Sequence, residues 1–160
     1  MPMPPRPRYT SLLLLWTLLT APSRANLGET VQQCVVRYGT PVGFTEATAK
    51  NPFGTVVFKA GGYVLLVFVL NDKEVGARVS KADQSAFTET ERQTILTADE
   101  TQTKWTPTKS DDPTCLAWSR SDNATALYDQ TKHMIIFTSP EMARALSSAP
   151  APPPPPTAKN

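Results

Sequence analysis

The sequence has few of the residues that most metal and cofactor sites require. It contains one histidine, His133, and two cysteines, Cys34 and Cys115, which lie far apart in the chain. These residues form none of the short Cys and His spacings of structural zinc sites. Acidic pairs such as Asp111-Asp112 lack the spaced oxygens and the central glycine of a calcium loop. The sequence therefore predicts no metal site and no cofactor.

The common signatures of catalysis are missing as well. The chain has no G-x-S-x-G turn, no glycine-rich phosphate loop and no H-E-x-x-H pair. His133 follows a turn at the start of an expected strand, a position typical of a surface histidine. We therefore expect a protein that is not an enzyme. A hydrolase that uses two carboxylates stays open as an alternative, because acidic side chains occur throughout the chain.

Long apolar runs are scarce, and the main one lies close to the first residue. Leu12–Thr20 is apolar, follows two arginines, and precedes Ser23-Arg24-Ala25, where small residues suit a cleavage site. This is the pattern of a secretory signal peptide over residues 1–25, and the run is too short for a stable membrane anchor. We expect cleavage before Asn26. No cysteine follows the cut, so no lipid anchor is expected, and the protein should be periplasmic or secreted.

The chain that follows the predicted leader, residues 26–160, has no excess of positive charge. The sequence has 16 basic and 14 acidic residues, and Arg6, Arg8 and Arg24 belong to the predicted leader. The remaining chain is close to neutral, which argues against binding nucleic acid or anionic membranes through general electrostatics. The expected partner is a protein, and its identity is not encoded in any recognisable motif.

Proline, by contrast, is abundant, with 16 residues in the chain, six of them in residues 149–160. Residues 149–160 include five consecutive prolines, which lack the N–H donor that helices and sheet ladders need. This segment is predicted to be a polyproline II spacer or a disordered tail. The residues between the leader and this segment, 26–148, are predicted to form a single folded domain.

The central feature of that domain is the apolar run Tyr63–Leu70. It stands between Gly61-Gly62 and Asn71-Asp72, and it predicts a strand that is buried on both faces. The flanking strands Thr55–Lys59 and Glu74–Lys81 alternate instead, with one polar face. Either another element covers the second face of the central strand, or that face binds a partner.

Three helices and a second set of strands complete the predicted order. Capping boxes at Thr30 and Thr88 open the first two helices, the second over Glu89–Gln102, and Ser139-Pro140 opens the third. The segments between these helices that are not strands are expected to be loops. We predict an α+β domain with an antiparallel sheet of about six strands in two meanders, α-βββ-α-βββ-α, and helices packed on one face. The second set of strands is expected at Cys115–Arg120, Ala124–Tyr128 and Met134–Thr138.

Two groups of residues are candidates for special roles. Cys34 and Cys115 would share an oxidising compartment, where they either form a disulfide or remain two buried thiols. Trp118, Arg120 and Tyr128 lie on neighbouring expected strands, and they form a candidate partner-contact patch if they share an outer sheet face.

The first helix and its flanks carry a family resemblance. Gly28-Glu29-Thr30, followed by eight residues and then Gly39-Thr40-Pro41, is similar to the opening of the SmpA/OmlA family of small envelope proteins. The resemblance implies the fold of the β-lactamase-inhibitor proteins, in which a short helical segment precedes an antiparallel sheet. The chain also resembles small exported bacterial proteins of unknown function. We expect an exported non-catalytic domain that acts as a protein-interaction or cell-envelope accessory factor, with a secreted enzyme inhibitor as an alternative.

Overall fold

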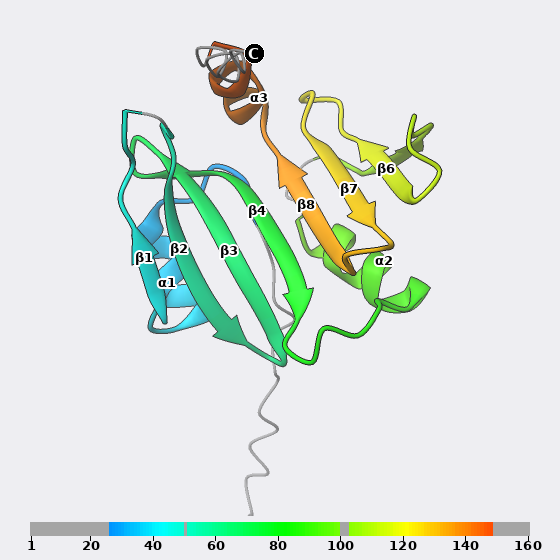
Figure 1. The fold of residues 1–160 in the computed structure, drawn as a ribbon, viewed down its shortest axis with the longest axis horizontal. Helices are drawn as coiled ribbons and strands as arrows, with labels where there is room; N and C mark the ends of the chain where they lie inside the picture. Colours follow the sequence, from blue (N-terminus) through cyan, green and yellow to red (C-terminus); the bar gives the residue numbers. More distant parts are fainter. Residues whose placement is uncertain (1–25, 50, 100–102, 149–160) are drawn as a thin grey trace, which may run out of the picture.

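The computed structural model describes residues 26–49, 51–99 and 103–148 (Figure 1). The predicted leader and the proline-rich tail lie outside these residues. In chain order, the described elements are α1 (Val31–Tyr38), β1 (Gly43–Thr45), β2 (Gly54–Ala60), β3 (Tyr63–Leu70), β4 (Lys73–Lys81), α2 (Glu89–Ala98), β5 (Thr106–Thr108), β6 (Cys115–Ser119), β7 (Thr125–Asp129), β8 (Met134–Thr138) and α3 (Pro140–Ser148).

All strands belong to one antiparallel sheet with the order β1-β2-β3-β4-β8-β7-β6-β5. Each half of the order is a meander, and the halves join where β4 pairs with β8, from Gly76–Thr138 to Ser80–Met134. The prediction of about six strands in two meanders is therefore wrong, since the sheet has eight strands and is continuous.

The two missed strands, β1 and β5, form the outer edges of the sheet. Each has three residues, and each lies in a segment that the sequence analysis assigned to a loop. So short a strand cannot show the alternating pattern by which strands are recognised. Pro107 in β5 lacks a donor N–H, which is tolerated at an edge because one side of the strand has no partner to bond.

The helix starts agree with the capping signals. In α1 the Gln33 N–H donates to Thr30 Oγ1 at 3.3 Å, and the Thr30 N–H donates to Gln33 Oε1 at 2.8 Å. Thr88 and Glu91 form the same box at α2, which ends at Ala98 and is shorter than predicted. Short-range side-chain bonds thus determine where these helices begin.

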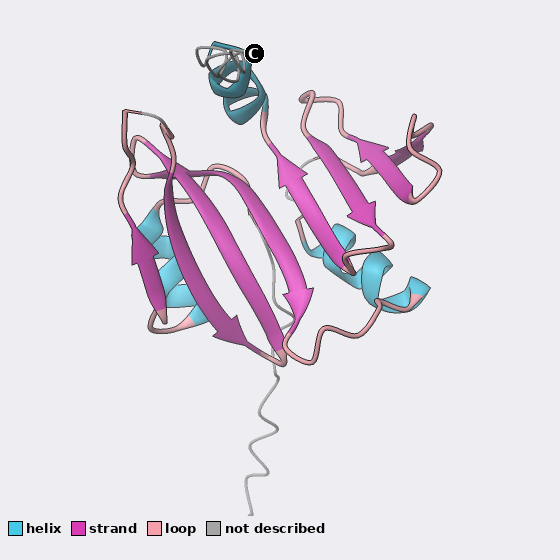
Figure 2. Ribbon diagram, in the orientation of Figure 1, coloured by secondary structure: helices cyan, strands magenta, loops and turns pink. Residues whose placement is uncertain are grey.

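The main core lies between the sheet and the helices α1 and α2, which pack on the same face (Figure 2). Phe58, Leu65, Ile135 and Phe137 of the sheet are completely buried there. The third helix packs on the opposite face, where Met142 joins a second, smaller cluster with Phe53 and Val75. The expectation that all helices cover one face is therefore also wrong. None of the helices in the described ranges is long and apolar enough to cross a membrane.

A β-bulge in β4 changes which side chains face the core. Phe68 pairs with Gly76, but Val69 pairs with Glu74, so Val75 is an extra residue on its strand. The bulge turns Val75 towards α3 and turns Glu74 towards the core below α1. Simple alternation along β4 predicts the reverse for both residues.

Candidate functional site

The helices α1 and α2 pack on one face of the sheet, and the opposite face, which α3 covers in part beside Phe68 and Val75, is turned towards the viewer in Figure 1. We call this the open face, formed on each strand by the side chains that point away from α1 and α2. One line of cross-strand partners runs over it from edge to edge, and we call that line the central row. The central row consists of Gly43, Val57, Leu66, Arg78, Ile136, Leu127, Ala117 and Thr108.

Most of the central row is apolar and only half buried. Val57, Leu66, Leu127 and Ile136 all keep part of their side chains in contact with solvent. Cross-strand partners stand about 5 Å apart, so Val57 lies beside Leu66 and Ile136 lies beside Leu127, with Arg78 between the two pairs. Apolar surface of this kind is typical of an interaction site on a soluble domain.

The charges that remain free on the open face are positive. Arg78 is exposed in the middle of the central row, with its guanidinium carbon 6.0 Å from the centroid of the Phe68 ring. Lys59 is exposed near one edge, and neither cation forms an ion pair within the described residues. The carboxylate of Asp129, on the same face, is bonded to Lys132 at 2.9 Å. A partner therefore meets apolar surface together with unpaired positive charge.

The three residues of the candidate contact patch do not share an exposed face. Tyr128 is 3% exposed, and its hydroxyl accepts a bond from the Phe87 N–H at 3.3 Å on the core side. Arg120 is 9% exposed. Trp118 is half buried against the main core. Trp118 and Tyr128 occupy the strand positions that face α2, which is why their shared face is covered.

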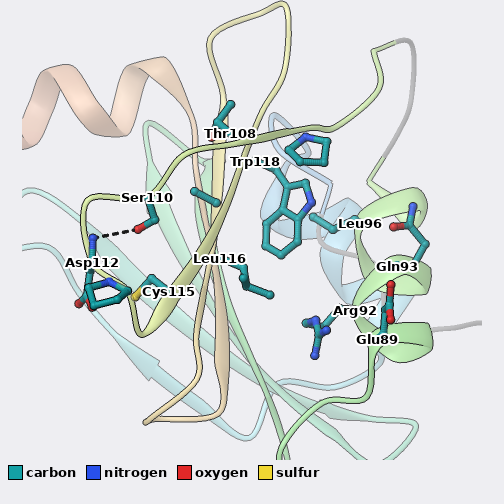
Figure 3. Close-up of a pocket in the computed structure, with 13 residues that line it drawn as sticks. Glu89, Arg92, Gln93, Leu96, Thr108, Ser110, Asp112, Cys115, Leu116 and Trp118 are labelled. Carbon is teal, nitrogen blue, oxygen red and sulfur yellow. Dashed lines mark hydrogen bonds between the residues drawn. The ribbon is translucent and has the colours of Figure 1, made fainter.

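Trp118 instead lines a pocket of about 410 Å³ between α2 and the β5–β6 edge. In Figure 3 the side chains of Trp118 and Leu116 from β6 lie opposite Leu96 and Arg92 from α2. The guanidinium of Arg92 already donates to the Phe87 carbonyl at 2.8 Å. The pocket thus offers the indole ring of Trp118 for binding, whereas the guanidinium of Arg92 is already hydrogen-bonded within the protein.

Arg120 is the centre of a buried ionic cluster. Its Nη1 lies 2.8 Å from Asp99 Oδ2, its Nη2 lies 2.6 Å from Asp122 Oδ2, and its guanidinium carbon lies 4.8 Å from the centroid of the Trp105 ring. Burial raises the pKa of Asp99 to about 7, with Arg120 opposing that effect. Hydrogen bonds from Arg120 lower the pKa of Asp122. One guanidinium thus holds both carboxylates, so the cluster ties the end of α2 to the turn between β6 and β7.

A second cluster contains the half-buried Glu29 and the buried Cys34 and Glu74, which no sequence motif connects. One ligand atom from each residue lies within 4.8 Å of the other two. Cys34 Sγ donates to Glu74 Oε2 at 3.4 Å across 40 positions of sequence. Burial raises the pKa of Glu74 well above its usual value and raises the pKa of the Cys34 thiol. The β4 bulge, which no sequence pattern predicts, turns the Glu74 side chain to the core side of the sheet, within hydrogen-bond distance of Cys34.

Both cysteines are free thiols in the structure, so they do not form the candidate disulfide. Cys34 lies in the main core, between α1 and the sheet. Cys115 is on β6, opposite Asp129 of β7, and its side chain points to the open face on the other side of the sheet. Cys34 is completely buried and Cys115 is half buried. The sheet itself therefore separates the two sulfur atoms.

Comparison with known proteins finds distant likenesses of structure. No family model matches the chain, and no curated protein matches it. A cysteine-rich secretory protein from Staphylococcus aureus is similar over 72% of this chain and 45% of its own, at 11% identity and a TM-score of 0.40. An extracellular protein containing a SCP domain from Bacillus anthracis is similar over 84% of this chain and 53% of its own, at 10% identity and a TM-score of 0.46. The chain spans about half the length of these two structures.

Proposed function

We propose that the chain is an exported, non-catalytic domain that binds another protein through its open face. The observation that carries this proposal is the central row, where half-buried apolar side chains run across the sheet without a covering element among the described residues. Partly exposed apolar side chains gathered on one sheet face support a role in protein contact. The free cations Arg78 and Lys59 favour a partner surface that carries carboxylates.

Serine substitutions in the central row test this proposal. We expect the double variant Leu66→Ser, Ile136→Ser to remain folded, because both side chains are only half buried and each loses less than about 1.5 kcal/mol of burial energy. Binding to the partner should fall at least tenfold. Wild-type and variant proteins, immobilised at equal density, are incubated with envelope and culture extracts, and the retained proteins are quantified by mass spectrometry.

The matched control is Val36→Ser, which changes an apolar residue that is 80% exposed on α1, away from the open face. Thermal unfolding followed by circular dichroism establishes that all three proteins are folded. Proteins retained by the wild type and Val36→Ser, but not by the double variant, support the open face. Equal retention by all three would show that the open face is not the binding surface.

Export is the second part of the proposal, and it is supported by the leader pattern of residues 1–25. The chain recovered outside the cytoplasm is expected to begin at Asn26. Intact-mass measurement of the exported protein checks this, because each additional residue changes the mass. A recovered chain that still contains residues before Ala25 would contradict cleavage by a signal peptidase.

A further inference from the structure

Glu29, Cys34 and Glu74 are held together by the backbone rather than by flexible side chains alone. The Glu74 N–H donates to the Glu29 carbonyl at 2.7 Å, and the Gly28 N–H donates to the Glu74 carbonyl at 2.8 Å. The Cys34 N–H then bonds the Thr30 carbonyl at 3.0 Å in the first turn of α1. The three side chains therefore start from neighbouring, rigid backbone positions, as a preorganised site requires.

The cluster contains buried polar atoms whose hydrogen-bonding capacity is not used. Glu74 is 1% exposed, and its Oε1 has no hydrogen-bond partner among the described residues. Asn26 is 8% exposed, donates from Nδ2 to Glu29 Oε1 at 3.0 Å, and likewise has no partner there for its Oδ1. A buried acceptor without a partner is costly, and in native structures such atoms commonly bind an ion or an ordered water.

We propose that Glu29, Cys34 and Glu74 bind a zinc ion. Carboxylates alone suit Mg²⁺ or Ca²⁺, but a thiolate among the ligands selects Zn²⁺ over these harder cations. A tetrahedral zinc ion with its usual Zn–S and Zn–O lengths places the sulfur and oxygen ligands about 3.5 Å apart. The distance from Cys34 Sγ to Glu74 Oε2 is 3.4 Å, which fits that edge. Asn26 Oδ1 or a water molecule supplies the fourth ligand.

The surroundings also balance the charge of the bound ion. On binding, any proton held by the Cys34 thiol or the Glu74 carboxyl leaves to solvent, so the ligands are one thiolate and two carboxylates. Arg37 forms an ion pair with Glu29, and Arg37 Nε lies 3.0 Å from Glu29 Oε2. The divalent ion and this guanidinium together neutralise the three anions. Arg37 and Asn26 also orient the Glu29 carboxylate from outside, as hydrogen-bonded neighbours of metal ligands do.

A cavity adjoins the cluster at Glu74. It has a volume of about 340 Å³, and Leu27, Gly28 and Glu74 contribute to its lining. Glu29 lies at the next position after Gly28, on the segment that borders this cavity. A zinc ion there would link the segment before α1 to strand β4, and its role would be to stabilise the fold independently of binding at the open face.

Metal titration of the full chain tests the site. After treatment with a chelator and dialysis, the protein should bind one equivalent of Zn²⁺ by isothermal titration, and elemental analysis should show the same ratio after removal of free metal. Added Zn²⁺ should raise the unfolding temperature. Co²⁺ should give the visible spectrum of a tetrahedral site together with a near-ultraviolet thiolate-to-cobalt band, which reports sulfur ligation in the wild-type protein without any substitution.

The two cysteines provide matched variants. Cys34→Ser should lose the thiolate-to-cobalt band, and Glu74→Gln should weaken Zn²⁺ binding at least about 100-fold, since even changes to residues behind the ligands cost 10- to 100-fold. Cys115→Ser should retain both properties, because Cys115 points to the opposite face of the sheet. Absence of stoichiometric zinc, a band that survives in Cys34→Ser, or a water molecule between Cys34 and Glu74 in zinc-soaked crystals would overturn the proposal.

Discussion

Replacing Arg120 by methionine is expected to lower the free energy of unfolding by about 3–5 kcal/mol, because the change leaves a buried carboxylate without its cation. Asp99 is 1% exposed and has its main charged partner in Arg120. The substitution also removes the bond from Arg120 to the Asp99 carbonyl and the guanidinium that lies above Trp105. Methionine preserves much of the side-chain volume. Urea unfolding followed by far-ultraviolet circular dichroism measures the loss.

Two further variants show whether the ion pair is responsible. Arg78→Met makes the same change on the open face, where Arg78 is exposed, and it should cost about 0.5 kcal/mol or less. Adding Asp99→Asn to Arg120→Met should recover part of the stability, because the stranded charge is gone. If Arg120→Met costs no more than Arg78→Met, the buried pair does not stabilise the fold.

Replacing Gly76 by alanine is expected to lower the free energy of unfolding by about 2–3 kcal/mol, the cost of overpacking a tight site. A Cβ atom at Gly76 would stand 2.8 Å from the Phe137 carbonyl oxygen, and the nearby Met142 Sδ would have to move away. The Met142 side chain is flexible, but the carbonyl belongs to β8. Gly76→Ala therefore strains the pairing of β4 with β8, the contact that joins the two meanders. Thermal and urea unfolding measure the effect.

Gly43→Ala is the matched control for Gly76→Ala. A Cβ atom at Gly43 would lie 3.6 Å from the Val57 side chain, which is an ordinary contact, so the stability should change by about 0.5 kcal/mol or less. Combining Gly76→Ala with Met142→Ala separates the two clashes. If the combined variant is as stable as Met142→Ala alone, the backbone of Phe137 tolerates the new methyl group and the pairing of β4 with β8 is not strained.

Local signals predicted most of the secondary structure. The capping boxes at Thr30 and Thr88 determine where α1 and α2 begin, since both partners of each bond lie within three positions. The Gly61-Gly62 turn has positive φ at both residues, which glycine adopts without strain, and β3 spans the predicted Tyr63–Leu70. These features depend on neighbours in sequence, and the sequence therefore specifies them.

The edges of the sheet depended on pairing with a neighbouring strand, and the join between its halves depended on partners far away in the chain. The strands β1 and β5 are too short to show a period, and they exist because β2 and β6 offer them unpaired backbone groups. The joining of β4 to β8 connects residues about 60 positions apart by pairing alone. No local pattern indicates either event, which explains why the strand number was wrong and why the continuous pairing across β4 and β8 was missed.

In the candidate sites, too, some features follow from the local sequence and others follow only from tertiary packing. Alternation correctly places the side chains of Leu66 and Arg78 together on one face of the sheet, but only the packing of α1 and α2 on the other face leaves that surface open. The bulge at Val75 reverses the alternation and directs Glu74 inward to Cys34. The sequence by itself thus determined the helix starts, the tight turns and the central strand, because their causes are local. The tertiary structure alone decided the joining of β4 to β8, the open face and the Glu29–Cys34–Glu74 cluster, because these depend on contacts between distant segments.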